Sequence, residues 1–171
     1  MLPDIASNIN TLTGSLTNNY VIGTDSTGGG ALYINQNANI GSIESSSVAS
    51  NYSIATADDS VGGAIANLGT INNIVTDFAN NYTQSSSAAA YGGAIYNKGS
   101  IGQVTAGFKK NYANSINGTA YGGAVYNSGT MSLHDGTIFE ENYAVGSAQA
   151  EGGAFSNTGT IREIINTTFT N

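Results

Sequence analysis

A ten-residue phrase that returns every 30 residues is the feature of this sequence that most restricts its fold. The phrase reads YGGAIYNKGS at 91–100 and YGGAVYNSGT at 121–130, and shorter copies begin at Gly62 and Gly152. A looser copy, GGALYINQN, begins at Gly29. A fixed period of this length indicates a repeat array, in which each unit buries its apolar face only against its neighbours.

A second phrase follows in each unit: an apolar residue, two variable residues and then Asn-Tyr. It reads FANNY at 78–82, FKKNY at 108–112 and FEENY at 139–143, with weaker copies at 16–20 and 48–52. The chain stops inside a further copy that begins at Phe169, so we expect it to be a piece of a longer exported chain. The predicted array has a partial unit at 1–28, full units at 29–61, 62–91, 92–121 and 122–151, and a truncated unit at 152–171.

The residue types favour strands over helices. Gly, Asn, Thr, Ser, Tyr and Ile dominate, whereas the helix formers Leu, Glu, Lys and Arg are scarce. Short segments such as AIYN, SIGQV and FKKNYA predict three strands in a unit, separated by Asn-x-Gly turns in which both residues tolerate a left-handed backbone. We expect the extra residues around 35–39 and just before Phe139 to lie in turns. The prediction is an all-β fold, a parallel β-solenoid with about 30 residues per coil.

Stacked coils turn each recurring residue into a column with a spacing of roughly 4.8 Å. The glycine pairs mark a crowded bend, where a Cβ would clash. An asparagine ladder is expected because stacked side-chain amides bond along the axis; its members are Asn19, Asn51, Asn81, Asn111 and Asn142. Three apolar columns are expected to form the core: Leu32, Ile65, Ile95, Val125 and Phe155; Phe78, Phe108, Phe139 and Phe169, preceded by Leu16 and Val48; and Ile71, Ile101, Met131 and Ile161.

The pairing of GGA[I/V]-x-N with F-x-x-N at this interval resembles the repeats of chlamydial polymorphic outer membrane proteins and related bacterial autotransporter passengers. The resemblance covers nearly the whole chain, which departs from the family in having no Cys and no C-terminal translocation barrel. It implies a single-stranded, right-handed parallel β-helix on the bacterial outer membrane surface or outside the cell, with an adhesive role. It also implies that the membrane is reached only through the missing barrel.

Charge and composition exclude several classes of function. A net charge of −7 with only four Lys and Arg residues leaves no basic patch for nucleic acid or for an anionic membrane. No Cys and a single His are too few ligands for zinc, and the Asp residues do not recur beside the glycines as a built-in calcium site requires. We therefore expect no metal and no cofactor.

The charged residues do not form a convergent catalytic set in the sequence. Arg162 is the only Arg, and the Glu pair at 140–141 occupies the variable positions that hold Lys at 109–110, which indicates solvent exposure. The pair at 134–135, His-Asp, lies in the stretch with the inserted residue and is expected in a bulged turn. We predict that the protein is not an enzyme; the catalytic alternative is a carbohydrate-active β-helix enzyme, which needs clustered carboxylates.

Tyrosines near the glycine phrases form the candidate binding surface. Tyr33, Tyr96 and Tyr126 alternate with apolar residues and are therefore expected to face outward, and Tyr91 and Tyr121 lie close to them in sequence. Two roles fit: contact with a glycan or a protein, since Tyr offers both apolar area and a hydroxyl, or stacking that stabilises adjacent coils. The variable linkers between each Asn-Tyr and the next glycines are the second candidate surface.

Two functional hypotheses of different classes follow. The first is a surface-displayed adhesin or autotransporter passenger that binds glycans or proteins of a host or neighbouring cell. The second is a structural solenoid, a stalk or filament that associates with itself end to end through exposed strand edges. A size in solution that increases with concentration would favour the second hypothesis.

Overall fold

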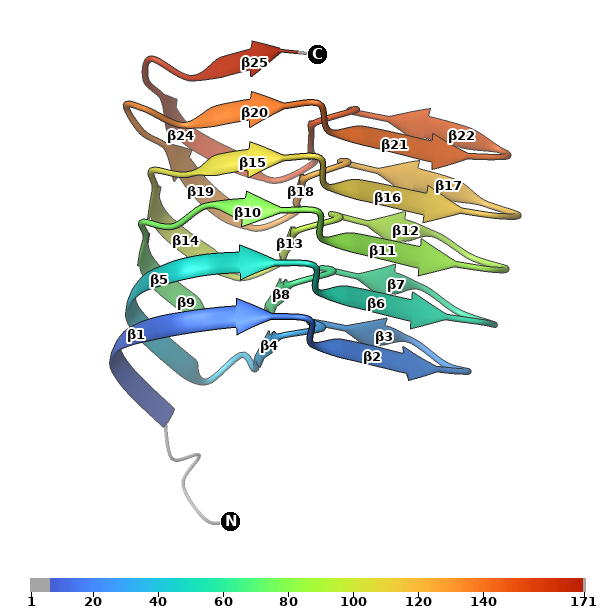
Figure 1. Ribbon diagram of the computed structural model, residues 1–171, viewed down its shortest axis with the longest axis horizontal. Coiled ribbons are helices and arrows are strands. Elements are labelled where there is room, and N and C mark those ends of the chain that lie inside the picture. Colours follow the sequence, from blue (N-terminus) through green and yellow to red (C-terminus); the bar gives the residue numbers. More distant parts are fainter. Residues whose placement is uncertain (1–6, 171) are drawn as a thin grey trace.

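The computed structural model describes residues 7–170, which form a right-handed β-solenoid running from β1 (Ser7–Thr17) to β25 (Thr168–Thr170) (Figure 1). These residues contain no helix, so none that could cross a membrane. All strand pairs are parallel, with partners one coil apart in sequence. The predicted fold class is confirmed. Residues 1–6 of the predicted partial unit, and Asn171 of the truncated one, lie outside the described residues.

The full coils from residue 62 onward each contribute five short strands to four parallel sheets, where the sequence predicted three. The largest sheet contains β1, β5 (Ala38–Ala49), β9 (Thr70–Ile74), β10 (Phe78–Ala79), β14 (Ser100–Val104), β15 (Gly107–Lys109), β19 (Thr130–Leu133), β20 (Ile138–Glu140), β24 (Thr160–Ile164) and β25. In the coil at 29–61 the long strand β5 pairs with both β9 and β10 and takes the place of two strands. The second contains β2 (Tyr20–Gly23), β6 (Tyr52–Ala55), β11 (Tyr82–Ser85), β16 (Tyr112–Ser115) and β21 (Tyr143–Gly146).

The two remaining sheets complete the coil. One contains β3 (Thr27–Gly28), β7 (Ser60–Val61), β12 (Ala90–Tyr91), β17 (Thr119–Tyr121) and β22 (Gln149–Glu151). The other contains β4 (Leu32–Ile34), β8 (Ile65–Asn67), β13 (Ile95–Asn97), β18 (Val125–Asn127) and β23 (Phe155–Asn157). Both inserted segments form turns, as predicted: Ala38 N–H donates to the Asn35 carbonyl over 2.9 Å, and Thr137 N–H to the His134 carbonyl over 3.0 Å.

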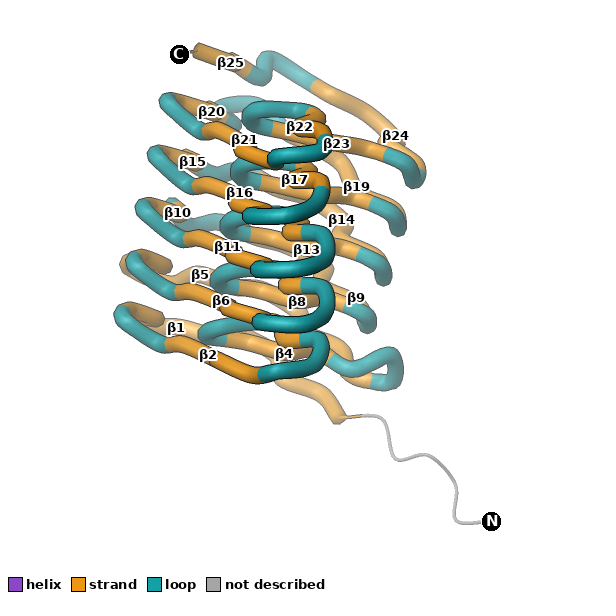
Figure 2. The backbone as a smooth tube through the Cα atoms, turned by 90° about the vertical axis from the view of Figure 1, so that its right-hand side faces the viewer, coloured by secondary structure: helices purple, strands orange, loops and turns teal. Residues whose placement is uncertain are grey.

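The coil has two parts, which we call the core lobe and the flange. The flange is the thin extension made by the sheets of β11 and β12, and it projects to the right in Figure 1 and towards the viewer in Figure 2. Small side chains fill the space between its two sheets, including Ser53, Ser60, Ala90, Ala113 and Ala120, all with no exposed surface. Only small residues allow two sheets to approach this closely, so the alternating Ser, Thr and Ala of these segments determine the thickness of the flange.

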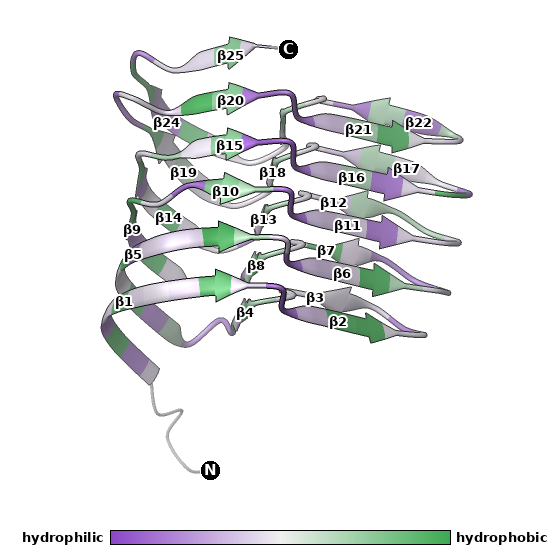
Figure 3. Cartoon of the chain, in the orientation of Figure 1, coloured by the Kyte–Doolittle hydropathy of each residue, from purple (hydrophilic) through white to green (hydrophobic). Residues whose placement is uncertain are grey.

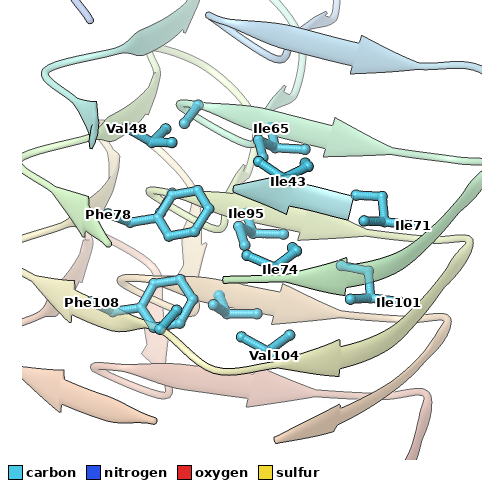
Figure 4. Packing of buried hydrophobic residues seen from close by; sticks show 14 of the residues in the cluster. Ile43, Val48, Ile65, Ile71, Ile74, Phe78, Ile95, Ile101, Val104 and Phe108 are labelled. Atoms are coloured by element: carbon cyan, nitrogen blue, oxygen red, sulfur yellow. The ribbon is translucent and has the colours of Figure 1, made fainter. Parts of the chain in front are cut away.

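The core lobe holds the large apolar side chains in stacked columns (Figure 4). The three predicted columns are in register, and their central members are fully buried. The phenylalanine rings stack with centroids 4.7–5.0 Å apart, whereas Phe169 in the last coil is 49% exposed. A fourth buried column, which the sequence analysis missed, lies beside them and consists of Ile43, Ile74, Val104 and Leu133.

The predicted asparagine ladder is present at the step between the core lobe and the flange. The Nδ2 groups of Asn19, Asn51, Asn81 and Asn111 each donate to the Oδ1 of the next ladder Asn over 2.9–3.0 Å. Those of Asn51, Asn81, Asn111 and Asn142 also donate to a main-chain carbonyl of the preceding coil. Figure 3 shows these links as hydrophilic segments that recur at the same place in each coil. Because the side-chain amide in the middle of the ladder makes four hydrogen bonds, it does not carry the desolvation penalty of an unpaired buried amide.

The Asn-x-Gly sequences form a second asparagine ladder, and their turns do not have the predicted left-handed backbone. Asn67, Asn97, Asn127 and Asn157 stack through Nδ2–Oδ1 hydrogen bonds of 2.6–2.8 Å. None of these Asn or the following glycines has a positive φ. That prediction was wrong because the side-chain amides are used for pairing between coils and the turn backbone stays in ordinary regions.

Left-handed backbone occurs instead at two other columns. The first glycine of each pair has it, as Gly92 does with a φ of 62°, and a Cβ on the second glycine, Gly93, would meet the carbonyl oxygens of Gly123 and Tyr112. This confirms the crowded bend. The second column is the residue before each ladder Asn, such as Ser50 with a φ of 56° and Lys110 with a φ of 55°.

Replacing Ser50 with glycine should therefore raise the free energy of unfolding by about 1 kcal/mol, because glycine has no Cβ to strain the left-handed conformation. Urea denaturation measures the change. The matched control is Ala49→Gly in the adjacent strand position, which should lower the free energy by roughly 0.5–1 kcal/mol. Equal losses in both variants would show that the positive φ stores no strain.

Candidate binding surfaces

Four of the five predicted tyrosines meet where the flange joins the core lobe, and we call them the tyrosine cluster: Tyr91, Tyr96, Tyr121 and Tyr126. Tyr91 and Tyr121 end strands of the flange, and Tyr96 and Tyr126 are the central residues of β13 and β18. The Gly-Gly-Ala bend between these strands turns the two walls towards each other. The rings of Tyr91 and Tyr126 are 4.8 Å apart at an angle of 59°, so rings from both walls interlock.

Tyr33 lies outside the cluster, although it belongs to the same column as Tyr96. Ala66 pairs with Tyr33 on one side and with Tyr96 on the other, so a coil with a small residue separates the two rings. Tyr33 is consequently 58% exposed, whereas each cluster tyrosine is partly covered by its neighbours. The structure thus places all five tyrosines outward and brings four of them into one patch.

Burial raises the pKa of two cluster hydroxyls, those of Tyr91 and Tyr96. Desolvation raises the pKa of Tyr91 to about 12, assisted by the negative charge of Asp59 and by the neighbouring tyrosines. Desolvation also raises the pKa of Tyr96, against the opposing effect of a hydrogen bond with Ser128. The Tyr126 hydroxyl lies 3.1 Å from Thr158 Oγ1 of the next coil. The patch therefore presents uncharged groups that can both donate and accept hydrogen bonds.

The raised pKa of Tyr91 predicts a loss of stability in alkali. An unfolded tyrosine has a pKa of about 10, so the folded state holds the Tyr91 proton more tightly. The resulting stabilisation is complete below pH 10 and is lost as the pH rises towards 12. Urea denaturation across this range should show a shallower decline for Tyr91→Phe than for the wild type. Identical slopes would contradict the shift, and measurements between pH 6 and 9 serve as the control.

A second row of tyrosines, not predicted as a surface, lies on the outer face of the flange and forms the tyrosine ladder: Tyr20, Tyr52, Tyr82, Tyr112 and Tyr143. Neighbouring rings stack at 4.8–5.1 Å with angles of 1–11°. Because the rings cover one another's faces, the ladder presents ring edges and hydroxyls to solvent. The signal was present in the sequence: each Tyr directly follows an inward ladder Asn, and strand residues alternate between faces.

The remaining candidate groups have structural partners. Lys109 Nζ lies 2.8 Å from Glu140 Oε1, and Lys110 Nζ lies 3.2 Å from Glu141 Oε2, on the exposed wall where the sequence placed them. His134 directly follows β19 and begins the inserted turn, with Nε2 3.1 Å from Glu163 Oε1. Within residues 7–170, no three His, Cys, Asp or Glu side chains are grouped to hold a metal ion.

The variable linkers form the tip of the flange (Figure 2). Their side chains bond between coils: Ser26 Oγ donates to Asp58 Oδ2 over 2.8 Å, and Ala89 N–H donates to Asp59 Oδ1 over 2.9 Å. The hydrogen bond from Ser26 lowers the pKa of Asp58, followed by the bond from the Asp59 main chain. Differences in linker sequence are thus accommodated without disturbing the sheets below.

Comparison with known proteins identifies no relative of this chain. No protein-family model, curated protein or solved structure matches the chain. The resemblance to polymorphic outer membrane proteins depends on the GGA[I/V]-x-N and F-x-x-N phrases alone, and it stays a prediction. What the protein binds must be inferred from its own surfaces.

Proposed function

We propose that this chain is a non-catalytic binding segment of a bacterial surface adhesin, of the autotransporter-passenger type, that contacts glycans or proteins of a host or neighbouring cell. The observation that carries the proposal is the tyrosine cluster, in which four amphipathic rings are held outward at a bend between two walls. Tyrosine supplies large contact area with little loss of side-chain entropy, which suits recognition surfaces.

The surroundings of the cluster support binding over chemistry. The walls beside it carry Val61 and Ala66 in the preceding coil and Glu151 and Ser156 in the following coil. A carboxylate pair such as glycoside hydrolysis uses would need two acidic side chains facing one substrate. Glu151 in the following coil accepts a hydrogen bond from Gln149 Nε2 over 2.6 Å, and Asp59, whose charge acts on Tyr91 from the preceding coil, accepts one from Ala89 N–H over 2.9 Å.

The test is a double substitution that copies residues from this protein's own neighbouring coils. Tyr96→Ala reproduces Ala66 one coil earlier, and Tyr126→Ser reproduces Ser156 one coil later, so the backbone register should be kept. We expect the wild type to bind members of a host-glycan or host-protein array and the double variant to lose most of that signal.

The matched control replaces Tyr82 and Tyr112 of the tyrosine ladder with alanine, which removes two tyrosines from the outer face of the flange. This variant should keep binding if the cluster is the recognition surface. Binding by the cluster variant at the wild-type level would overturn the assignment to the cluster. Absence of binding by the wild type on both arrays would overturn the adhesin proposal.

A second proposal, self-association through the solenoid ends, is favoured by a specific observation at the last coil. Phe169 is 49% exposed and Ile164 55% exposed, although their columns are buried in the preceding coils. An uncovered coil offers unpaired strand edges together with apolar side chains. Light scattering over a tenfold range of concentration tests it: increasing mass supports the stacking of rods, and a constant monomer mass contradicts it.

A further inference from the structure

A depression of about 260 Å³ lies on the outer wall of the core lobe, on the strands that directly precede those of the tyrosine ladder. It spans β10, β15 and β20, and six residues shape it: Asp77, Ala79, Gly107, Lys109, Ile138 and Glu140. Drug-sized ligands occupy pockets of roughly 300–1,000 Å³, so this volume suits a smaller molecule.

The depression exists because two outward columns contain a small residue at this level. Gly107 pairs with Ile138 in the next coil, and Asp77 precedes Gly107 in the same column. In the adjacent column Ala79 pairs with Lys109. Two larger residues at Gly107 and Ala79 would fill the space, so these positions provide the floor and their neighbours provide the walls.

The walls offer acceptors, donors and an apolar face together. Gly107 N–H donates to Asp77 Oδ1 over 2.7 Å, which holds the carboxylate in place and leaves Oδ2 for a ligand. Lys109 Nζ donates to Glu140 Oε1 over 2.8 Å, and an ammonium has two further hydrogens. Ile138 contributes a side chain that is 45% exposed.

This mixture selects against charged ligands. An anion would face the carboxylates of Asp77 and Glu140, and a cation would face the ammonium of Lys109. A neutral ligand with several hydroxyl groups satisfies both kinds of wall, since each hydroxyl donates one hydrogen bond and accepts others. A ring with one apolar face could also pack on Ile138.

We propose that this depression binds one pyranose ring of a neutral glycan. Asp77 Oδ2 and Glu140 accept from ring hydroxyls, Lys109 donates to a ring oxygen or hydroxyl, and the apolar face of the sugar packs on Ile138. The proposal rests on the adhesin function and deepens it, because it assigns a glycan subsite on a wall separate from the tyrosine cluster.

The test fills the depression without disturbing the fold. A Cβ at Gly107 would lie 2.8 Å from Asp77 Oδ1, the end of a side chain that can rotate away. The column already holds the β-branched residues Ile138 and Thr168, so Gly107→Ile should fold normally. Ser47→Ile is the matched control, because it adds the same side chain to this wall one coil before Asp77, outside the depression.

An NMR titration of the labelled chain with a panel of neutral monosaccharides gives the readout. We expect shifts of the Gly107 and Lys109 amides, roughly tenfold or greater weakening in Gly107→Ile, and wild-type affinity in Ser47→Ile. Asp77→Asn keeps the shape and removes the charge, and it should weaken binding in the same assay.

The arrays separate failure of this proposal from failure of the adhesin function. Glycan binding that persists in Gly107→Ile but is lost in the tyrosine-cluster variant would overturn the subsite and keep the adhesin function. Binding to proteins alone would do the same. Absence of any binding by the wild type would overturn both.

Discussion

Replacing Asn111 with alanine should lower the free energy of unfolding by about 4 kcal/mol. Asn111 is fully buried, and its side chain makes four hydrogen bonds of 2.9–3.0 Å. Its Oδ1 accepts from the main chain and side chain of Asn81, and its Nδ2 donates to the Phe78 carbonyl and to Asn142 Oδ1. Alanine would leave these partners buried without a substitute, so the loss exceeds that of a single hydrogen bond.

The matched control for this prediction is Asn114→Ala in the same coil. Asn114 faces outward on β16 and has a hydrogen bond of 3.4 Å to Gln84 Oε1, so its removal should change the free energy by about 0.5 kcal/mol or less. Urea denaturation followed by far-UV circular dichroism gives both values. Similar losses in the two variants would mean that the ladder contributes no more than an exposed amide does.

Replacing Phe108 with alanine should lower the free energy of unfolding by a similar amount, about 4 kcal/mol. Its ring is fully buried between those of Phe78 and Phe139, at centroid distances of 5.0 and 4.7 Å. Truncation removes the apolar area and leaves a cavity in the middle of the column. Parallel pairing on both sides holds the strands in place, so the coil cannot collapse to fill the space.

Phe169→Ala provides the comparison, because it is the same substitution in the same column at a position that is 49% exposed. We expect a loss of about 1–2 kcal/mol there, since part of the ring already contacts water. The difference between the two variants measures the contribution of the surrounding coils. Equal losses would show that burial inside the stack adds nothing to the contribution of the ring.

The sequence alone predicted the features that depend on period and alternation. An interval of 30 residues places Phe78 over Phe108 and Asn81 over Asn111. Alternation along a strand then determines which residues face inward. The apolar columns, the first asparagine ladder and the outward tyrosines follow from these two rules.

Other features were missed because two structures share one sequence signal. Asn-x-Gly is typical of a left-handed turn, so the ladder of Asn67, Asn97 and Asn127 was hidden behind a common alternative. The strands of the flange are only two to four residues long and have small interior residues, so they lack an apolar pattern. The tyrosine cluster required the angle of the Gly-Gly-Ala bend, which residue spacing does not specify.

The equal register of the coils also makes the length of this molecule independent of its cross-section. Tyr91 pairs with Tyr121, and each is followed by the same Gly-Gly-Ala sequence. Excision of residues 92–121 would therefore join Tyr91 to Gly122 and recreate a junction that the protein already contains. Unequal recombination within such a gene can add or remove whole layers while every ladder stays continuous, so reach can evolve separately from the surface that the walls present.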